Sequence, residues 1–184
     1  MDQSAALYRQ FLSGDKDALV EIIRLHKDGL ILYIYSITRH LGLAEELAEE
    51  TFVRLVVKKP RFHGKSQFKT WLYAIGHHIT VDYLRRASKR SSLSFEQLNN
   101  QTDGQTLEDA YIREERNRLL HQSLAKLNDH YSQVLYLTYF EDLTRDEVAQ
   151  VMGRSKRQIE NLIYHAKAAL REQLRKEGFC DEGL

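Results

Sequence analysis

The sequence contains few of the residues that break helices or join chain segments covalently. Its 184 residues include one proline, Pro60, nine glycines and one cysteine, Cys180. One cysteine excludes an intrachain disulfide framework and a cysteine-rich zinc site, and indicates a free thiol in a reducing compartment. Alternating strand-like runs are also scarce, whereas Leu, Ala, Glu, Lys, Arg and Gln are abundant. We therefore expect an all-α fold.

Membrane and targeting signals are missing as well. No apolar run approaches the roughly 20 residues that cross a bilayer. The first residues, MDQSAALYRQF, lack the basic-then-apolar pattern of a secretory signal. We expect a cytoplasmic protein with no membrane insertion.

The patterns typical of enzymes are also absent. The sequence has no phosphate-binding glycine loop, nucleophile elbow or Cys–His pair. Among eight histidines, the adjacent His77 and His78 offer only the His78–Asp82 pair at helical spacing. A zinc site needs three or four ligands. We expect no catalytic residue, no metal and no cofactor.

Charge is distributed unevenly along the chain, although the formal net charge is only +1. Residues 58–90 hold nine Lys/Arg and one acidic residue, residues 96–115 hold one basic and six acidic residues, and residues 154–176 hold seven basic and two acidic residues. Two basic blocks around an acidic one suggest two modules that face nucleic acid and a linker that faces elsewhere.

The first basic block contains a helix pattern. Phe68, Trp71, Leu72, Ile75 and Ile79 follow the spacing of one buried face, and Ser66 is a candidate cap. The other face mixes rings and cations, which suits an unpaired nucleic-acid strand; it holds Lys69, Tyr73, His77, His78, Val81 and Arg85. The alternative is a core helix with a solvated basic face.

Three helices are expected before this block, at about residues 3–13, 16–40 and 43–57. Asp15 is a suitable N-cap for the second. The third carries an acidic stripe formed by Glu45, Glu46, Glu49 and Glu50. The stripe is either a solvated face with acids favourably placed in the first turn or a docking surface.

A change of composition divides the chain. Residues 91–112 are rich in Ser, Asn, Gln, Thr and Asp and have a weak apolar pattern. We expect a flexible acidic linker there, between a helical domain at 1–90 and a second at 113–177, with a tail at 178–184. Helices are expected at about 113–127 and 129–140, the latter capped by Asn128 or Asp129.

The following segment has the pattern of a helix-turn-helix. Thr144 and Glu147 form a capping box, Leu143 and Val148 can form a hydrophobic staple, and Ser155 and Gln158 repeat the capping-box spacing. Gly153 between them can end a helix in the left-handed conformation. A second, basic helix would place its first turns in a DNA major groove. The alternative is a plain helical hairpin of a bundle.

Several side chains of that second helix can face outward and contact DNA. Lys156, Arg157 and Lys167 suit phosphates or guanine, Asn161 suits adenine, and Glu160 can accept from cytosine. The full candidate set is Ser155, Lys156, Arg157, Gln158, Glu160, Asn161, Tyr164, His165 and Lys167.

Taken together, the segments AEELAEETFVRL, FKTWLYAIGHHITVDYLRR and LTRDEVAQVMGRSKRQIENLIYHAKAALR resemble, in this order, an extracytoplasmic-function (ECF) sigma factor of bacterial RNA polymerase. The resemblance covers nearly the whole chain. It implies two small helical domains, a sigma-2-like bundle and a sigma-4-like helix-turn-helix. It also implies that the chain binds core polymerase and directs promoter-specific initiation.

The resemblance assigns roles to the candidate residues. The acidic helix would dock on the β′ clamp helices through Glu45, Glu46, Glu49, Glu50 and Val56. The first basic block would read the melted −10 element through Arg61, Phe62, His63, Lys65, Lys69, Trp71, Tyr73, His77, His78, Arg85 and Arg86. The helix-turn-helix would read the −35 duplex and touch the β flap. An anti-sigma factor is a further expected partner.

The sequence departs from the family pattern in both DNA-reading helices, and the first departure is Trp71-Leu72, where primary sigma factors place two adjacent aromatics. Relatives often hold Asn where His78 stands, and many have a cation and Ser-Arg where Glu160-Asn161-Leu162 stand. Base preferences at both elements, the regulon and the inducing signal therefore stay open. A stand-alone helix-turn-helix regulator is the alternative function, but it would leave the acidic and aromatic helices unexplained.

Overall fold

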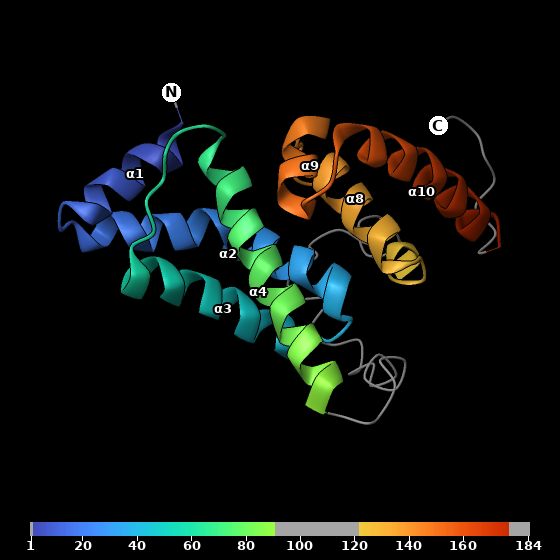
Figure 1. Cartoon of the computed structure of the whole chain (residues 1–184), viewed down its shortest axis with the longest axis horizontal. Coiled ribbons are helices and arrows are strands. Elements are labelled where there is room, and N and C mark those ends of the chain that lie inside the picture. The colour runs from blue at the N-terminus through green and yellow to red at the C-terminus, as the bar shows by residue number, and fades with distance from the viewer. Residues whose placement is uncertain (1, 91–121, 177–184) are drawn as a thin grey trace.

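The computed structural model describes residues 2–90 and 122–176 (Figure 1). Within these ranges the chain forms helices and connections and no strand. The helices are α1 (Gln3–Leu12), α2 (Lys16–Thr38), α3 (Leu41–Lys58), α4 (Phe68–Arg90), α8 (Asp129–Tyr139), α9 (Arg145–Met152) and α10 (Lys156–Lys176). The all-α prediction is confirmed. The predicted linker at 91–112 and the tail at 178–184 lie outside the described residues, as does most of the helix predicted at 113–127; its described part is helical at 122–125.

Side-chain oxygen or nitrogen atoms cap the start of each of the first four helices. Asp15 accepts hydrogen bonds from the backbone N–H of Asp17 and Ala18, as predicted, and His40 caps α3 through the N–H of Leu43. The predicted cap for α4 was wrong. Asp2, which also caps α1, accepts from the N–H of Phe68, because α1 packs beside the start of α4.

The capping pattern of the last helices is confirmed. Thr144 and Glu147 form the reciprocal capping box of α9, and Ser155 and Gln158 exchange equivalent bonds at the start of α10. Gly153 has φ +62°, a conformation that glycine adopts without steric cost. The segment therefore forms a helix-turn-helix with a glycine turn.

The last three helices pack against the first four. Helix α8 contacts α2 and α9 contacts α4, while α10 lies on the far side of α8 and α9 (Figure 1). The buried apolar side chains form one continuous cluster that extends from α1–α4 into α8–α10.

None of the helices in the described residues is long and apolar enough to cross a membrane.

Candidate nucleic-acid interface

An aromatic cluster positions the loop between α3 and α4. The Tyr8 hydroxyl donates to the carbonyl of Pro60 at 2.8 Å, and the Phe62 ring lies 5.2 Å from Trp71 and 5.6 Å from Phe68. Trp71 and Phe62 are half-buried in this cluster, so their rings hold the loop on the first turns of α4. The neighbouring side chains of Arg61, His63 and Lys65 remain exposed.

The second half of α4 presents a polar, cationic surface. His78, Arg85 and Arg86 are exposed. Asp82 lies between them and binds Arg85 and Arg86, each at 2.6 Å. The hydrogen bond from Arg85, reinforced by the charge of Arg86, lowers the pKa of Asp82. Asp82 thus holds both guanidinium groups on one side of the helix.

Three residues expected on the outward face of α4 are covered instead. Tyr73 is completely buried, and His77 and Lys69 are half-buried. The expectation of an open face was wrong at these positions, because helices α8 and α9 pack over them. The Lys69 ammonium group binds the carboxylate of Glu141 at 2.6 Å and its carbonyl at 2.9 Å.

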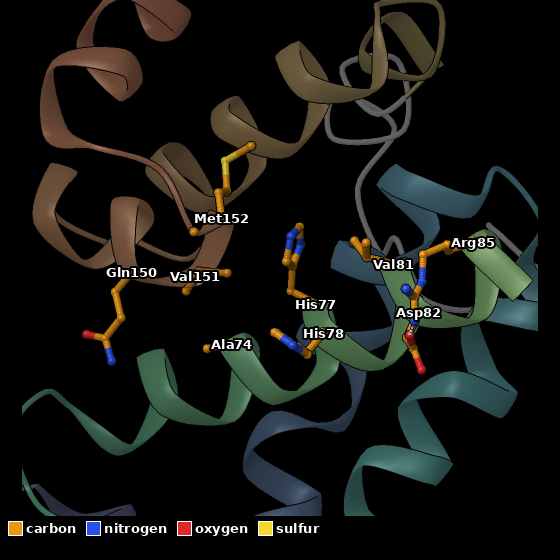
Figure 2. A pocket seen from close by; sticks show the side chains of 10 residues that line it. Ala74, His77, His78, Val81, Asp82, Arg85, Gln150, Val151 and Met152 are labelled. Atoms are coloured by element: carbon orange, nitrogen blue, oxygen red, sulfur yellow. Dashed lines mark hydrogen bonds and ion pairs between the residues drawn. The ribbon is translucent and has the colours of Figure 1, made fainter.

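A cleft of about 520 Å³ separates α4 from α9 beyond this contact. In Figure 2, His77 and Ala74 of α4 face Val151 and Met152 of α9, and His78, Asp82 and Arg85 continue along the α4 wall. Nδ1 of His77 lies 2.9 Å from the Tyr33 hydroxyl. Burial, followed by the charges of His78, His130 and Arg154, lowers the pKa of His77 to about 4. His77 is therefore neutral near pH 7.

The acidic stripe on α3 is accessible. Glu46, Glu49 and Glu50 are exposed and Glu45 is half-buried. The stripe continues into exposed apolar side chains, since Val53 is 55% exposed and Val57 68%, with Val56 beside them. Acidic and apolar side chains thus share one helix surface. The exposed valines other than Val56 were missed, although their run, VRLVV, was visible in the sequence.

All nine candidate DNA-contacting residues at the helix-turn-helix are exposed; they are Ser155, Lys156, Arg157, Gln158, Glu160, Asn161, Tyr164, His165 and Lys167. Ile159, Ile163 and Ala166 form the opposite, buried face of α10. Two ion pairs join the outer side of α10 to α9: Lys156 binds Asp146 at 2.8 Å, and Arg145 lies 3.6 Å from Glu160.

The contacts that join the two halves of the molecule had no signal in the sequence, and four residues that make them show this. These residues are Arg39, Glu141, Glu147 and Gln150. Each interacts with a partner more than 70 positions away, so helix periodicity and spacing give no information about it.

The described residues contain no group of three or more His, Cys, Asp or Glu side chains that could hold a metal ion.

Comparison with known proteins identifies the two halves separately. Residues 22–90 match the family Sigma-70 region 2, and residues 117–170 match the family Sigma-70, region 4. The first match contains most of α2 and all of α3 and α4, and the second contains the helix-turn-helix. A stand-alone regulator would need only the second, so that alternative is not favoured.

Relatives match along most of their length. RNA polymerase sigma factor YlaC of Bacillus subtilis is 29% identical over 163 residues, covering 88% of this chain and 94% of its own. ECF RNA polymerase sigma factor SigW of the same organism is 29% identical over 176 residues, which are 91% of this chain and 94% of SigW. The fold resembles that of CnrH in its complex with the cytosolic domain of CnrY, with a TM-score of 0.66 and 23% sequence identity. The match covers 95% of this chain and 99% of the CnrH structure's chain. The chain belongs to the sigma-70 family of RNA polymerase sigma factors, in the extracytoplasmic-function group, and is a factor that directs the polymerase to promoters.

Proposed function

We propose that this sigma factor has three binding surfaces. Helix α3 binds core RNA polymerase, α4 with its preceding loop binds a melted −10 element, and α10 binds a −35 duplex. The observation that supports this division most strongly is the match to regions 2 and 4 in order. Residues 1–90 would act as the first domain, residues 113–177 as the second and residues 91–112 as the linker between them.

The polymerase surface consists of exposed acids beside exposed valines. Glu46, Glu49 and Glu50 would face a basic partner, and Val53, Val56 and Val57 would bury apolar area in the same contact. Complementary charge increases the association rate and fixes the register, whereas apolar burial supplies affinity. The β′ clamp helices are the proposed partner, and the second domain would contact the β flap.

The −10 surface combines an anchored loop with the exposed part of α4. Arg61 and Lys65 offer cations for the backbone, His63 is exposed between them, and His78 offers a ring and ring nitrogens to an extruded base. Unstacking a base costs a few kcal/mol, and stacking and hydrogen bonds between the protein and the base edge must offset this cost. Trp71 and Phe62 support the loop rather than offer open rings.

The −35 surface is the outer face of α10. Its first turns carry Lys156 and Arg157, and Asn161 and Tyr164 follow one and two turns later. Tyr164 is 73% exposed, so its ring can contact a groove wall or a thymine methyl group. An anti-sigma factor that covers these surfaces is a further proposed partner, by analogy with solved structures such as CnrH with CnrY.

In vitro transcription tests the function directly. Purified core polymerase is supplied with this chain on templates carrying randomised −35 and −10 regions, and transcripts are sequenced. We expect discrete start sites that appear only when the chain is added and that share two sequence elements. Stable binding of the chain to duplex DNA, with no binding to core polymerase, would contradict the proposal.

A further inference from the structure

A second hollow, of about 560 Å³, lies where the ends of α2 and α4 meet the start of α8. It shares His77, Val81, Arg85 and Met152 with the cleft of Figure 2 and extends from them to residues of α8. We call it the α8 cleft. Sites for small molecules have volumes of about 300–1,000 Å³, so the α8 cleft is large enough for a small organic ligand.

Part of the lining of the α8 cleft is apolar and comes from three helices. Ile37 of α2 and Met152 of α9 are buried, while Leu84 of α4 is half-buried. Val81, also of α4, is 45% exposed. Covering apolar side chains of this kind with a ring removes them from water and is favourable. This part of the lining therefore suits a flat heteroaromatic ring.

Two guanidinium groups belong to the same cleft, one from each half of the molecule. Arg154, after the glycine turn, is half-buried, and its guanidinium group lies 3.2 Å from Nε2 of His130. Within the part of the chain that the structure describes, Arg154 has no carboxylate partner. Arg85 of α4 binds Asp82 through one nitrogen and is otherwise exposed. Each group can donate two parallel hydrogen bonds to a phosphate.

The carboxylates beside the α8 cleft do not cancel this positive charge. Asp82 is shared by Arg85 and Arg86, each at 2.6 Å, and Asp129 lies 3.5 Å from Arg39. Both carboxylates are thus already paired with guanidinium groups. The guanidinium group after the glycine turn adds a charge that neither of them balances. The cleft therefore has a surplus of positive charge, which favours an anionic ligand.

Gln133 of α8 adds a polar group that has no partner. It lines the cleft and is only 3% exposed. Its Oε1 atom accepts no hydrogen bond from any residue that the structure describes. A buried acceptor without a donor costs about 1–3 kcal/mol. A ligand that brings an N–H group to this amide would remove the cost, and bases carry such groups on their edges.

We propose that the α8 cleft is a binding site for a free nucleoside phosphate. Arg154 and Arg85 bind the phosphate, the apolar lining contacts the base, and Gln133 accepts a hydrogen bond from the base edge. A ligand with only one of these parts would leave either the surplus charge or the buried acceptor unmatched. The inference does not depend on the proposed function, because this chain alone supplies the site.

Titration calorimetry on the full chain, without DNA or polymerase, tests the site. The probes are the ribonucleoside mono- and triphosphates, and ribose 5-phosphate, which has a phosphate but no base. We expect at least one nucleotide to bind with one-to-one stoichiometry and a Kd below about 1 mM, and ribose 5-phosphate to bind at least about tenfold more weakly because it leaves the Gln133 acceptor unpaired. No binding of any nucleotide at millimolar concentration would overturn the proposal.

Two variants locate the ligand, and one serves as a control. Arg154→Gln should weaken nucleotide binding at least about tenfold, since it removes charged hydrogen bonds to the phosphate. Gln133→Leu should lower nucleotide affinity to that of ribose 5-phosphate and leave ribose 5-phosphate itself unaffected. Arg175→Gln removes the same charge at the exposed end of α10 and should bind normally. Equal affinity in Arg154→Gln and Arg175→Gln would contradict the site.

A DNA strand carries the same phosphate and base chemistry, so a short single-stranded oligonucleotide is a further probe. Binding of the oligonucleotide through Arg154, with no binding of any mononucleotide, would overturn the proposal and assign the cleft to DNA. Promoter-specific transcription by a chain that binds no nucleotide would also overturn this inference and leave the proposed function in place. Nucleotide binding that depends on Arg154 would support the site even if no promoter-specific transcript appeared.

Discussion

Glu49 and Glu50 are exposed on α3 beside Val53 and Val57, and at the residue scale they carry the proposal for polymerase binding. Glu50 approaches Arg54 at 3.5 Å across an exposed turn, a pair that contributes little in water. Neither carboxylate has a structural role in the fold. Their charge is therefore available to a partner.

Reversing both charges should weaken binding to core polymerase by at least about tenfold, since like charges brought together at an interface cost several kcal/mol. The change is Glu49→Lys with Glu50→Lys, measured by competition with another sigma subunit. Glu21→Lys with Glu172→Lys makes the same charge change elsewhere and should compete normally. Equal competition by both double variants would contradict the assignment of α3.

His26 makes stability depend on pH. It is buried, lies 2.8 Å from the Ser4 hydroxyl, and has a pKa lowered to about 4 by burial, with a smaller contribution from Lys69 that Asp2 opposes. The unfolded chain binds a proton at about pH 6.5. The contribution of neutral His26 to the free energy of unfolding is thus fully present above pH 6.5. It is lost as the pH decreases toward 4, which lowers the free energy of unfolding by up to about 3 kcal/mol.

Chemical denaturation at pH 7 and pH 4.5 measures this effect. The glutamine in His26→Gln cannot be protonated, so this variant should lose less unfolding free energy between pH 7 and pH 4.5. Some loss should remain, because the pKa of His77 is also lowered. Substituting an exposed histidine, His165→Gln, should leave the loss unchanged. If His26→Gln loses as much stability as the original chain, His26 is not the source.

At the element scale, the helix-turn-helix was largely predictable from the sequence. Its two capping boxes and its glycine turn depend on residues three or four positions apart, so the sequence contains the whole signal. The cap of α4 was not predictable in this way, because Asp2 lies 66 positions from Phe68. Local contacts are visible in the sequence, whereas contacts between distant elements are not.

Removing the cap of α9 should destabilise the second unit. Thr144→Ala removes the hydroxyl that accepts a hydrogen bond from the Glu147 N–H and donates one to the Glu147 carboxylate, at a cost of about 1 kcal/mol. Thr138→Ala removes a hydroxyl that bonds within α8 and is the matched control. Denaturant unfolding should show the larger loss for Thr144→Ala; equal losses would contradict the capping role.

At the scale of the whole molecule, the sequence predicted the fold class but not the packing of its halves. Tyr73 and His77 follow a spacing that places them opposite the core of the first unit, but the structure buries Tyr73 and half-buries His77 between α2 and the second unit. No periodicity in α4 could show that another element covers it. The same packing covers part of a surface that has nucleic-acid character.

Site-specific crosslinking on promoter DNA tests most directly whether α4 binds the −10 element and α10 binds the −35 element. A photoreactive residue is placed at His78 in one sample and at Tyr164 in another, each bound to core polymerase on a promoter found by transcription. We predict that position 78 crosslinks to the unpaired non-template strand at the −10 element and position 164 to the −35 duplex. Crosslinks from both positions to one element, or to neither, would contradict the account.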